Sequence, residues 1–139
     1  MRIFIDANIV LDVLLERQDF FEESKMVMAL CKSQKSALAP HTISNIFFIT
    51  RKDFTAKERK KILLNILEYV DIVPTGKYQV VKALKNDEID DFEDALQLEC
   101  AREFNADFIV SRDVNGFTNA DIEVITPLEF VKKFGEKYA

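Results

Sequence analysis

The sequence predicts an α/β fold of three layers, with a mostly parallel sheet of about five short strands lying between helices. Short runs rich in β-branched and aromatic residues alternate with helical segments along all 139 residues, the order expected of a parallel sheet covered on both faces. Hydrophobic residues make up 48% of the chain and charged residues 31%, which favours a packed core over disorder. The length fits one domain, residues 1–139.

The expected elements follow one another with short connections. Strand-like runs occupy residues 2–6, 36–39, 71–74, 108–111 and 123–125. Helical periodicity covers residues 9–17, 20–32, 41–52, 55–70, 78–85 and 91–105, and a last helix starts at Thr126. Thr55 with Glu58, and Thr126 with Glu129, have the spacing of capping boxes. The acidic stretch 86–91 is expected to form a mobile loop.

Several classes of protein are excluded by residue types that are rare in the chain. His41 is the only histidine, which excludes a two-histidine acid–base nuclease and sites that need several imidazoles. Cys31 and Cys100 match no zinc or redox spacing, and we expect both to be small buried residues. Neither a signal peptide nor an apolar stretch of membrane-spanning length is recognisable. We therefore expect a soluble cytoplasmic protein with no membrane partner.

Charge is distributed unevenly along a chain whose net charge is −5. Residues 1–70 carry a net +2 and residues 71–139 a net −7. A protein polarised in this way can bind phosphates with one patch and cations with the other. The alternative for the basic run is a solvated helix face. The candidates for contacts with RNA phosphates are Arg51, Lys52, Lys57, Arg59, Lys60 and Lys61.

Three aspartates are placed to meet at one edge of the predicted sheet. Asp6 ends the first strand, Asp113 follows the fourth, and Asp94 lies in the first turn of the helix between them. Ligands of open parallel sheets bind beyond the carboxyl ends of the strands. Converging carboxylates repel one another, and a hard divalent cation such as Mg²⁺ or Mn²⁺ relieves that repulsion. Taken singly, each acid is equally well explained as a helix cap or a solvated charge.

Four segments of the chain form a recognisable pattern: Asp6-Ala7-Asn8, 91–97 (DFEDALQ), 109–113 (IVSRD) and 121–130 (DIEVITPLEF). Together they resemble the signature of the PIN-domain family, in its bacterial branch with VapC-type toxin ribonucleases. The resemblance implies a PIN-like three-layer fold and a metal-dependent endoribonuclease, in which water activated by Mg²⁺ or Mn²⁺ attacks the RNA phosphate in line. It implies Asp6, Asp94 and Asp113 as metal ligands, and as partners RNA, an antitoxin protein and a second copy in a homodimer.

Asn45 departs from the family pattern, which places a glutamate in the helix after the second strand. An asparagine adds an oxygen but no charge, so either Asp91 or Glu93 is expected to supply the missing carboxylate. The alternative is that Asn45 is a hydrogen-bonded polar group beside Phe48. The same departure raises a second hypothesis, a non-catalytic or weakly active PIN module that binds RNA or a protein.

A third class, phosphoryl transfer of the receiver or haloacid-phosphatase kind, also uses an aspartate after the first strand. It is disfavoured because position 8 is Asn8 and because Asp6 has no acidic neighbour. Two pairs of aromatic residues, at positions 20–21 and 47–48, are expected in the core or in a dimer interface.

Overall fold

A computed structural model describes residues 1–117 and 119–138. Its centre is a parallel sheet of five strands in the order β3-β2-β1-β4-β5. The expected five-stranded sheet is confirmed, and every pairing in it is parallel. The strands are β1 (Arg2–Ile5), β2 (Lys35–Leu38), β3 (Asp71–Ile72), β4 (Phe108–Val110) and β5 (Glu123–Ile125).

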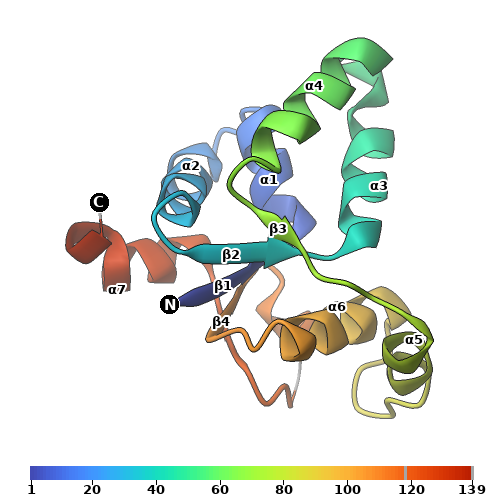
Figure 1. The fold of residues 1–139 in the computed structure, drawn as a ribbon. Coiled ribbons are helices and arrows are strands. Elements are labelled where there is room, and N and C mark those ends of the chain that lie inside the picture. The colour runs from blue at the N-terminus through green and yellow to red at the C-terminus, as the bar shows by residue number, and fades with distance from the viewer. Residues whose placement is uncertain (118, 139) are drawn as a thin grey trace.

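Helices cover both faces of the sheet (Figure 1). Successive side chains of a strand point to opposite faces, and β1 shows the result. Ile3 and Ile5 belong to the core beneath α1, α2 and α7, whereas Phe4 packs into a second core with residues of α6 such as Leu98. The predicted three-layer α/β/α arrangement is therefore confirmed. The helices are α1 (Ala7–Leu14), α2 (Phe21–Cys31), α3 (Pro40–Ile49), α4 (Ala56–Ile66), α5 (Lys77–Leu84), α6 (Phe92–Glu103) and α7 (Pro127–Tyr138).

Helices α3 and α4 form an arm that extends beyond the sheet (Figure 1). The helix expected over residues 41–52 ends as α3 at Ile49 and continues as a 3-10 turn, η1 (Thr50–Lys52). Thr50 Oγ1 donates to the Ile46 carbonyl at 2.7 Å, a bond that commonly bends or ends a helix. The capping box of Thr55 and Glu58 starts α4 as expected, and α4 stops at Ile66 instead of residue 70.

The expectation that the two cysteines are small buried residues is confirmed. Both cysteines are free and buried, and burial raises the pKa of the Cys31 thiol to about 12. A thiol of this kind stays protonated and unreactive at neutral pH. Among the described residues, no helix combines the length and the apolar character that crossing a membrane requires.

Candidate metal centre

Asp6 lies directly after β1 and is held by hydrogen bonds to both carboxylate oxygens. Oδ1 accepts from the Ala7 backbone N–H at 2.6 Å and from Gln97 Nε2 at 2.9 Å. Oδ2 accepts from Ser111 Oγ at 2.7 Å and, more distantly, from Asn8 Nδ2 at 3.4 Å. Asp6 is thus the N-cap of α1 and also contacts two further segments, through Gln97 on α6 and Ser111 after β4. Its role as a helix cap is therefore compatible with a place in the candidate site.

Gln97 and Ser111 are the two supports of Asp6 that reasoning from the sequence did not single out. Gln97 is 1% exposed, lies three residues after Asp94 on α6, and leaves its Oε1 without a partner among the described residues. Ser111 Oγ also accepts from the Asp113 backbone N–H at 3.0 Å. The only signal in the sequence was a polar residue standing within an apolar helix stripe.

Asp94 and Asp113 face one small space beside Gly116, in the 3-10 turn η2 (Val114–Phe117). A Cβ added to Gly116 would lie 2.6 Å from Asp113 Oδ2 and 2.7 Å from Asp94 Oδ2. The Gly116 N–H donates to Asp113 Oδ1 at 3.1 Å. Two carboxylate oxygens therefore approach the same point, in a gap left open because residue 116 has no side chain.

The electrostatics of Asp94 record the crowding of acids. Burial is the largest cause that raises the pKa of the Asp94 carboxyl to about 7, and the charges of Asp91, Asp113, Asp6 and Glu93 contribute after it in that order. A shift of this size is typical of groups that need either a proton or a cation. The charges of Asp113 and Asp6 therefore both act on Asp94.

The α3 side of the site is occupied by Asn45. Asn45 Nδ2 donates to Glu93 Oε1 at 3.0 Å, so this residue faces the first turn of α6. Asp91 is exposed and caps α6, accepting from the Asp94 backbone N–H at 3.0 Å. Of the two proposed replacements for the missing carboxylate, Glu93 is the one in contact with Asn45.

The residues fit a divalent cation in the chemistry of their side chains. Carboxylates are the donors that Mg²⁺ and Mn²⁺ prefer, and the close approach of two carboxylates at Gly116, the raised pKa of Asp94 and the unpaired Gln97 Oε1 all favour a cation nearby. As the side chains stand, no three His, Cys, Asp or Glu groups in the described chain surround a single point. Binding would therefore require side-chain rotations that bring the carboxylates together.

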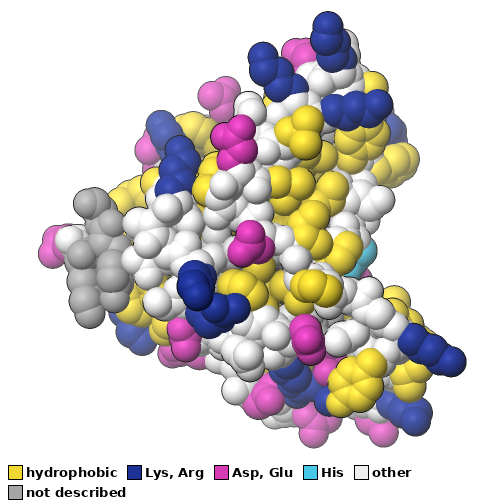
Figure 2. Space-filling model, in the orientation of Figure 1, with side chains coloured by type: hydrophobic (Ala, Val, Ile, Leu, Met, Phe, Trp, Pro, Cys, Tyr) yellow, Lys and Arg dark blue, Asp and Glu magenta, His cyan; other side chains and the backbone are white. Residues whose placement is uncertain are grey.

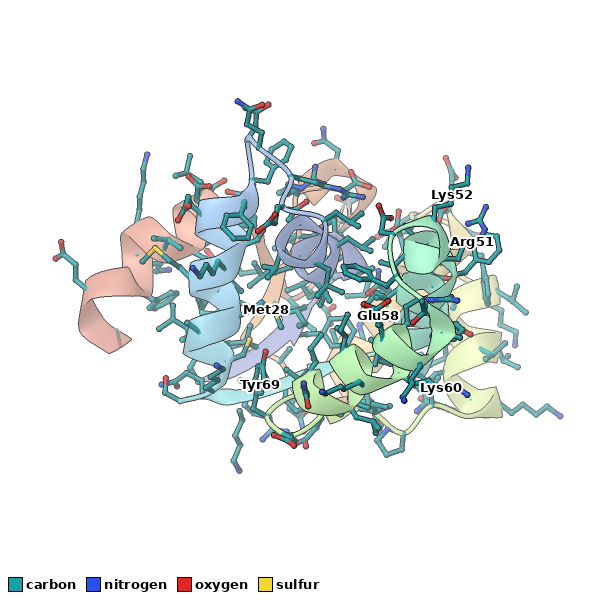
Figure 3. All side chains as sticks on the ribbon, turned by 90° about the horizontal axis from the view of Figure 1, so that it is seen from above. Met28, Arg51, Lys52, Glu58, Lys60 and Tyr69 are labelled. Atoms are coloured by element: carbon teal, nitrogen blue, oxygen red, sulfur yellow. The ribbon has the colours of Figure 1, made fainter. Side chains whose placement is uncertain are left out.

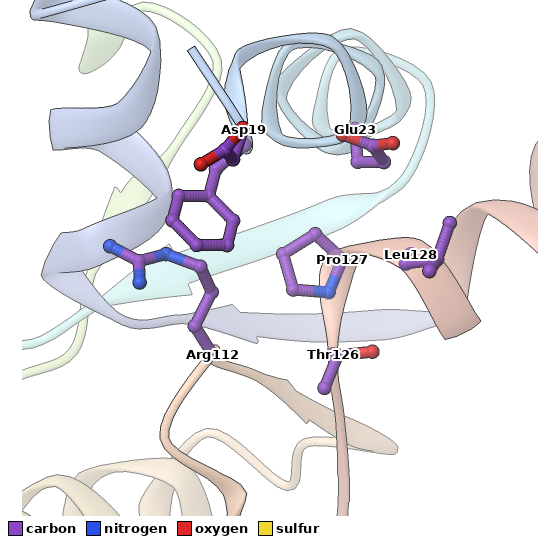
Figure 4. A pocket seen from close by; sticks show the side chains of 7 residues that line it. Asp19, Glu23, Arg112, Thr126, Pro127 and Leu128 are labelled. Carbon is purple, nitrogen blue, oxygen red and sulfur yellow. The ribbon is translucent and has the colours of Figure 1, made fainter. Parts of the chain in front are cut away.

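A buried ion pair anchors the loop that carries Asp113. Asp12 of α1 is fully buried and accepts two hydrogen bonds from Arg112, at 2.9 and 3.0 Å. The Arg112 guanidinium lies over the ring of Phe20, 4.0 Å from its centroid. Beside it a cavity of about 360 Å³ opens between α2 and the start of α7 (Figure 4), and only Arg112 links this cavity to the carboxylates. Arg112 is thus committed to holding the loop.

The basic run lies on the α3–α4 arm. Arg51 and Lys52 are at the turn between the helices, and Lys60 projects from α4 (Figure 3). The arginines stack on aromatic rings, Arg51 on Phe48 at 3.9 Å and Arg59 on Phe47 at 4.1 Å. The two aromatic residues differ in burial: Phe47 packs against the core as expected, whereas Phe48 is 61% exposed and lies outside it. The expected phosphate contacts Lys52, Lys57, Lys60 and Lys61 are exposed.

The structure has a parallel sheet between helices, with acidic residues after β1 and β4 and at the start of α6. These features place it among α/β proteins with an acidic site at the carboxyl ends of the strands. The chain belongs to the PIN domain family, whose model matches residues 2–115. It is 30% identical over 142 residues to Ribonuclease VapC1 of Aquifex aeolicus (strain VF5), an alignment that covers 96% of this chain and 95% of that protein.

Solved structures with the same fold are complexes of the VapBC and toxin–antitoxin kind. VapBC2 from Rickettsia felis, bound to a DNA fragment from its promoter, superposes with a TM-score of 0.68 at 14% identity, covering 91% of this chain and 98% of that one. VapBC-1 from nontypeable Haemophilus influenzae gives 0.66 at 13%, covering 92% and 99%. A toxin–antitoxin complex from Klebsiella pneumoniae gives 0.67 at 18%, covering 89% and 96%.

Proposed function

We propose that this protein is a ribonuclease of the VapC kind that hydrolyses RNA phosphodiester bonds with Mg²⁺ or Mn²⁺. The observation that carries the proposal is the approach of the Asp94 and Asp113 carboxylates to one point beside Gly116, with the charge of Asp6 acting on Asp94. The named relative, a ribonuclease, supports the same activity. Asp6, Asp94 and Asp113 are the proposed ligands, with Glu93 as the further carboxylate.

A bound divalent cation would supply a Lewis acid for the phosphate and lower the pKa of a water molecule. The residues of the chain fix where that chemistry takes place. Asp6 is oriented by Gln97 and Ser111, and Asp113 is held by the Arg112–Asp12 pair in the preceding turn. The roles of these groups are orientation and charge, the two contributions that dominate phosphoryl chemistry.

The test is cleavage of single-stranded RNA with and without Mn²⁺, in the wild type and in Asp113→Asn. Asp113 is exposed, so the variant should fold. Cleavage should require the cation and disappear in the variant, while RNA binding stays equal or strengthens because a negative charge is lost near the phosphate. Cleavage that survives in Asp113→Asn at the wild-type rate would exclude this site.

We propose that RNA reaches the carboxylates along the basic arm. Lys and Arg side chains gather at the outer end of α3 and α4 (Figure 2), and phosphate contacts there would make binding fall steeply with salt. Reversing Lys57, Lys60 and Lys61 to Glu should weaken binding to all RNA sequences about equally, because phosphates carry no base information. The matched control reverses Lys25, Lys32 and Lys35, which are equally exposed but lie on α2 and β2. Equal losses in both triple variants would assign the effect to net charge.

An antitoxin partner, a homodimer and a cytoplasmic location are also proposals. The antitoxin partner draws support from the VapBC and toxin–antitoxin complexes among the solved structures of this fold. The arm offers an apolar hollow of about 470 Å³ between α3 and α4, lined by residues such as Ile43, Phe47 and Leu63. Co-expression with the protein encoded by the neighbouring gene, followed by size-exclusion chromatography with light scattering, tests both assemblies.

One observation favours the second candidate, a weakly active or non-catalytic PIN module. Asn45 brings no charge to the site. Its side-chain amide also donates a hydrogen bond to the Glu93 carboxylate, which leaves fewer free carboxylate oxygens for a cation. Binding of RNA with a Mn²⁺-independent affinity and no cleavage at any Mn²⁺ concentration would favour this alternative over the nuclease.

A further inference from the structure

The first turn of α3 carries His41, the only histidine in the chain. β1 and β2 are paired with Phe4 beside Ala37, so Asp6, two residues beyond Phe4, lies level with the residue before α3. His41 is half-buried, and the charges that act on it belong to Glu93 and Asp6. The imidazole therefore lies at the border of the carboxylate site.

His41 Nε2 is buried and makes no hydrogen bond to any residue in the described ranges 1–117 and 119–138. Buried polar atoms in native proteins nearly always have a partner, so an exception needs an explanation. Gln97 Oε1 is likewise buried and unpaired, although Gln97 Nε2 contacts Asp6. Two unpaired atoms thus belong to the helices that carry Asn45 and Asp94.

The orientation of α3 agrees with a role for His41 in the site. Residues four apart on a helix share a face, and Asn45, four residues after His41, donates to Glu93 at 3.0 Å. The face that carries both residues is therefore turned towards the first turn of α6. Glu93 and Asp94 lie in that turn.

The protonation state of His41 leaves a lone pair free. Burial lowers the pKa of the imidazole, and the charges of Glu93 and Asp6 offset this only in part. The ring is then neutral at neutral pH, and a neutral imidazole has one nitrogen that accepts a hydrogen bond or binds a metal.

We propose that His41 supplies Nε2 as a nitrogen ligand to the cation of the carboxylate site, so that this site prefers a first-row transition ion such as Mn²⁺ to Mg²⁺. The inference rests on the proposed function, since it takes a cation at this site as given. Imidazole binds first-row transition ions, whereas Mg²⁺ favours oxygen ligands alone. His41 would thus add a nitrogen ligand to a site in which Asn45 adds no carboxylate.

The decisive experiment uses the wild-type sequence, so that folding is not in question. Because the chain has a single histidine, growth with ¹⁵N-histidine labels His41 alone among the side chains and leaves the metal chemistry unchanged. Pulsed electron paramagnetic resonance of the Mn²⁺-loaded protein should show a directly coordinated ¹⁴N, replaced by a ¹⁵N signal after labelling. Mn²⁺ that binds without a histidine nitrogen coupling would overturn the assignment of His41 and leave the nuclease proposal standing.

A second measurement tests the metal preference. His41→Gln should weaken Mn²⁺ binding roughly 10- to 100-fold in isothermal titration, while Mg²⁺ affinity changes much less. Equal losses for the two cations would overturn the proposed preference. If neither cation binds the wild type at millimolar concentration, the carboxylate site is not a metal site, and both this inference and the proposed function fail.

Discussion

Replacing Gly116 with alanine tests the carboxylate site through its space. The added Cβ would lie 2.6 and 2.7 Å from the oxygens of Asp113 and Asp94, where ordinary contact begins at 3.4 Å. The oxygens must retreat by about 0.7 to 0.8 Å to restore contact distance. Gly116 does not have a positive φ, so alanine meets no backbone strain. The variant therefore changes the place of two proposed ligands and little else.

The Gly116→Ala substitution should weaken metal binding and leave the stability of the apo protein nearly unchanged. The displaced atoms are ends of side chains, and Gly→Ala at a compatible φ gains about 0.4–1 kcal/mol from the unfolded chain, so apo stability should change little. Loss of ligand geometry should weaken Mn²⁺ binding roughly 10- to 100-fold. At a Mn²⁺ concentration a hundredfold above the wild-type Kd, stabilisation by the ion then falls from about 2.7 kcal/mol to between about 0.4 and 1.4.

Thermal melts with and without Mn²⁺ measure this difference. At roughly 4 °C per kcal/mol for a domain of this size, the wild type should gain about 10 °C and Gly116→Ala only about 2–5 °C. The control is Gly76→Ala, whose Cβ would meet nothing closer than Gln79 Oε1 at 3.9 Å and which should keep the wild-type gain. The same Mn²⁺ shift in the wild type and in Gly116→Ala would refute the placement of the ion between Asp94 and Asp113.

Three further changes test the neighbouring groups. Asn45→Glu places a second carboxylate beside Glu93, so the apo protein should melt lower and gain more from Mn²⁺ than the wild type; a lower melt with no gain in Mn²⁺ affinity would contradict this. The pKa of Asp94 is raised in the folded state to about 7 from 3.8. Between these two values the native state binds the proton more tightly than the unfolded chain does, so apo stability should fall as the pH rises through this range to 7. Solvent screening limits this to about 1–2 kcal/mol, and the slope in a urea titration between pH 5 and 8 should flatten in Asp94→Asn. Asp12→Asn leaves Arg112 without its buried partner and should cost about 3–5 kcal/mol in the same titration, whereas a loss below 1 kcal/mol would show that the pair does not anchor the loop.

The fold was predictable from the sequence because its signals are local. Short apolar runs, capping boxes at Thr55 and Thr126 and the Pro at position 127 act within a few residues, and the structure keeps all of them. Helix ends were less accurate. The end of α3 depends on the bond from Thr50 Oγ1 to a carbonyl one turn earlier, a choice that periodicity does not reveal.

The site was predictable only in its acids. Asp6, Asp94 and Asp113 could be placed because parallel strands end at one edge, and each position follows from the order of elements. Gln97, His41 and the Asp12–Arg112 pair could not, since their roles depend on contacts between residues as far as 100 positions apart. On a helix, a buried polar residue and an exposed one look alike until the packing face is known.

The hydrogen bonds of Asp6 determine which part of the site can move. Its oxygens already accept from Ala7, Gln97 and Ser111 at 2.6–2.9 Å, and a carboxylate offers only about four lone-pair positions. The weakest of its donors is Asn8, at 3.4 Å. A cation that approaches Asp6 would therefore displace Asn8 first, at the smallest energetic cost.

Asp113 differs from Asp6 in being exposed, and Asp94 is only partly buried. Their side chains can rotate towards an ion without breaking the buried network around Asp6. In the candidate site, Asp6 at the end of β1 is thus fixed by its hydrogen bonds, whereas the carboxylates of Asp94 and Asp113 can change position. This division would allow the three proposed ligands to bind one cation although, among the described residues, no three ligand groups surround a single point.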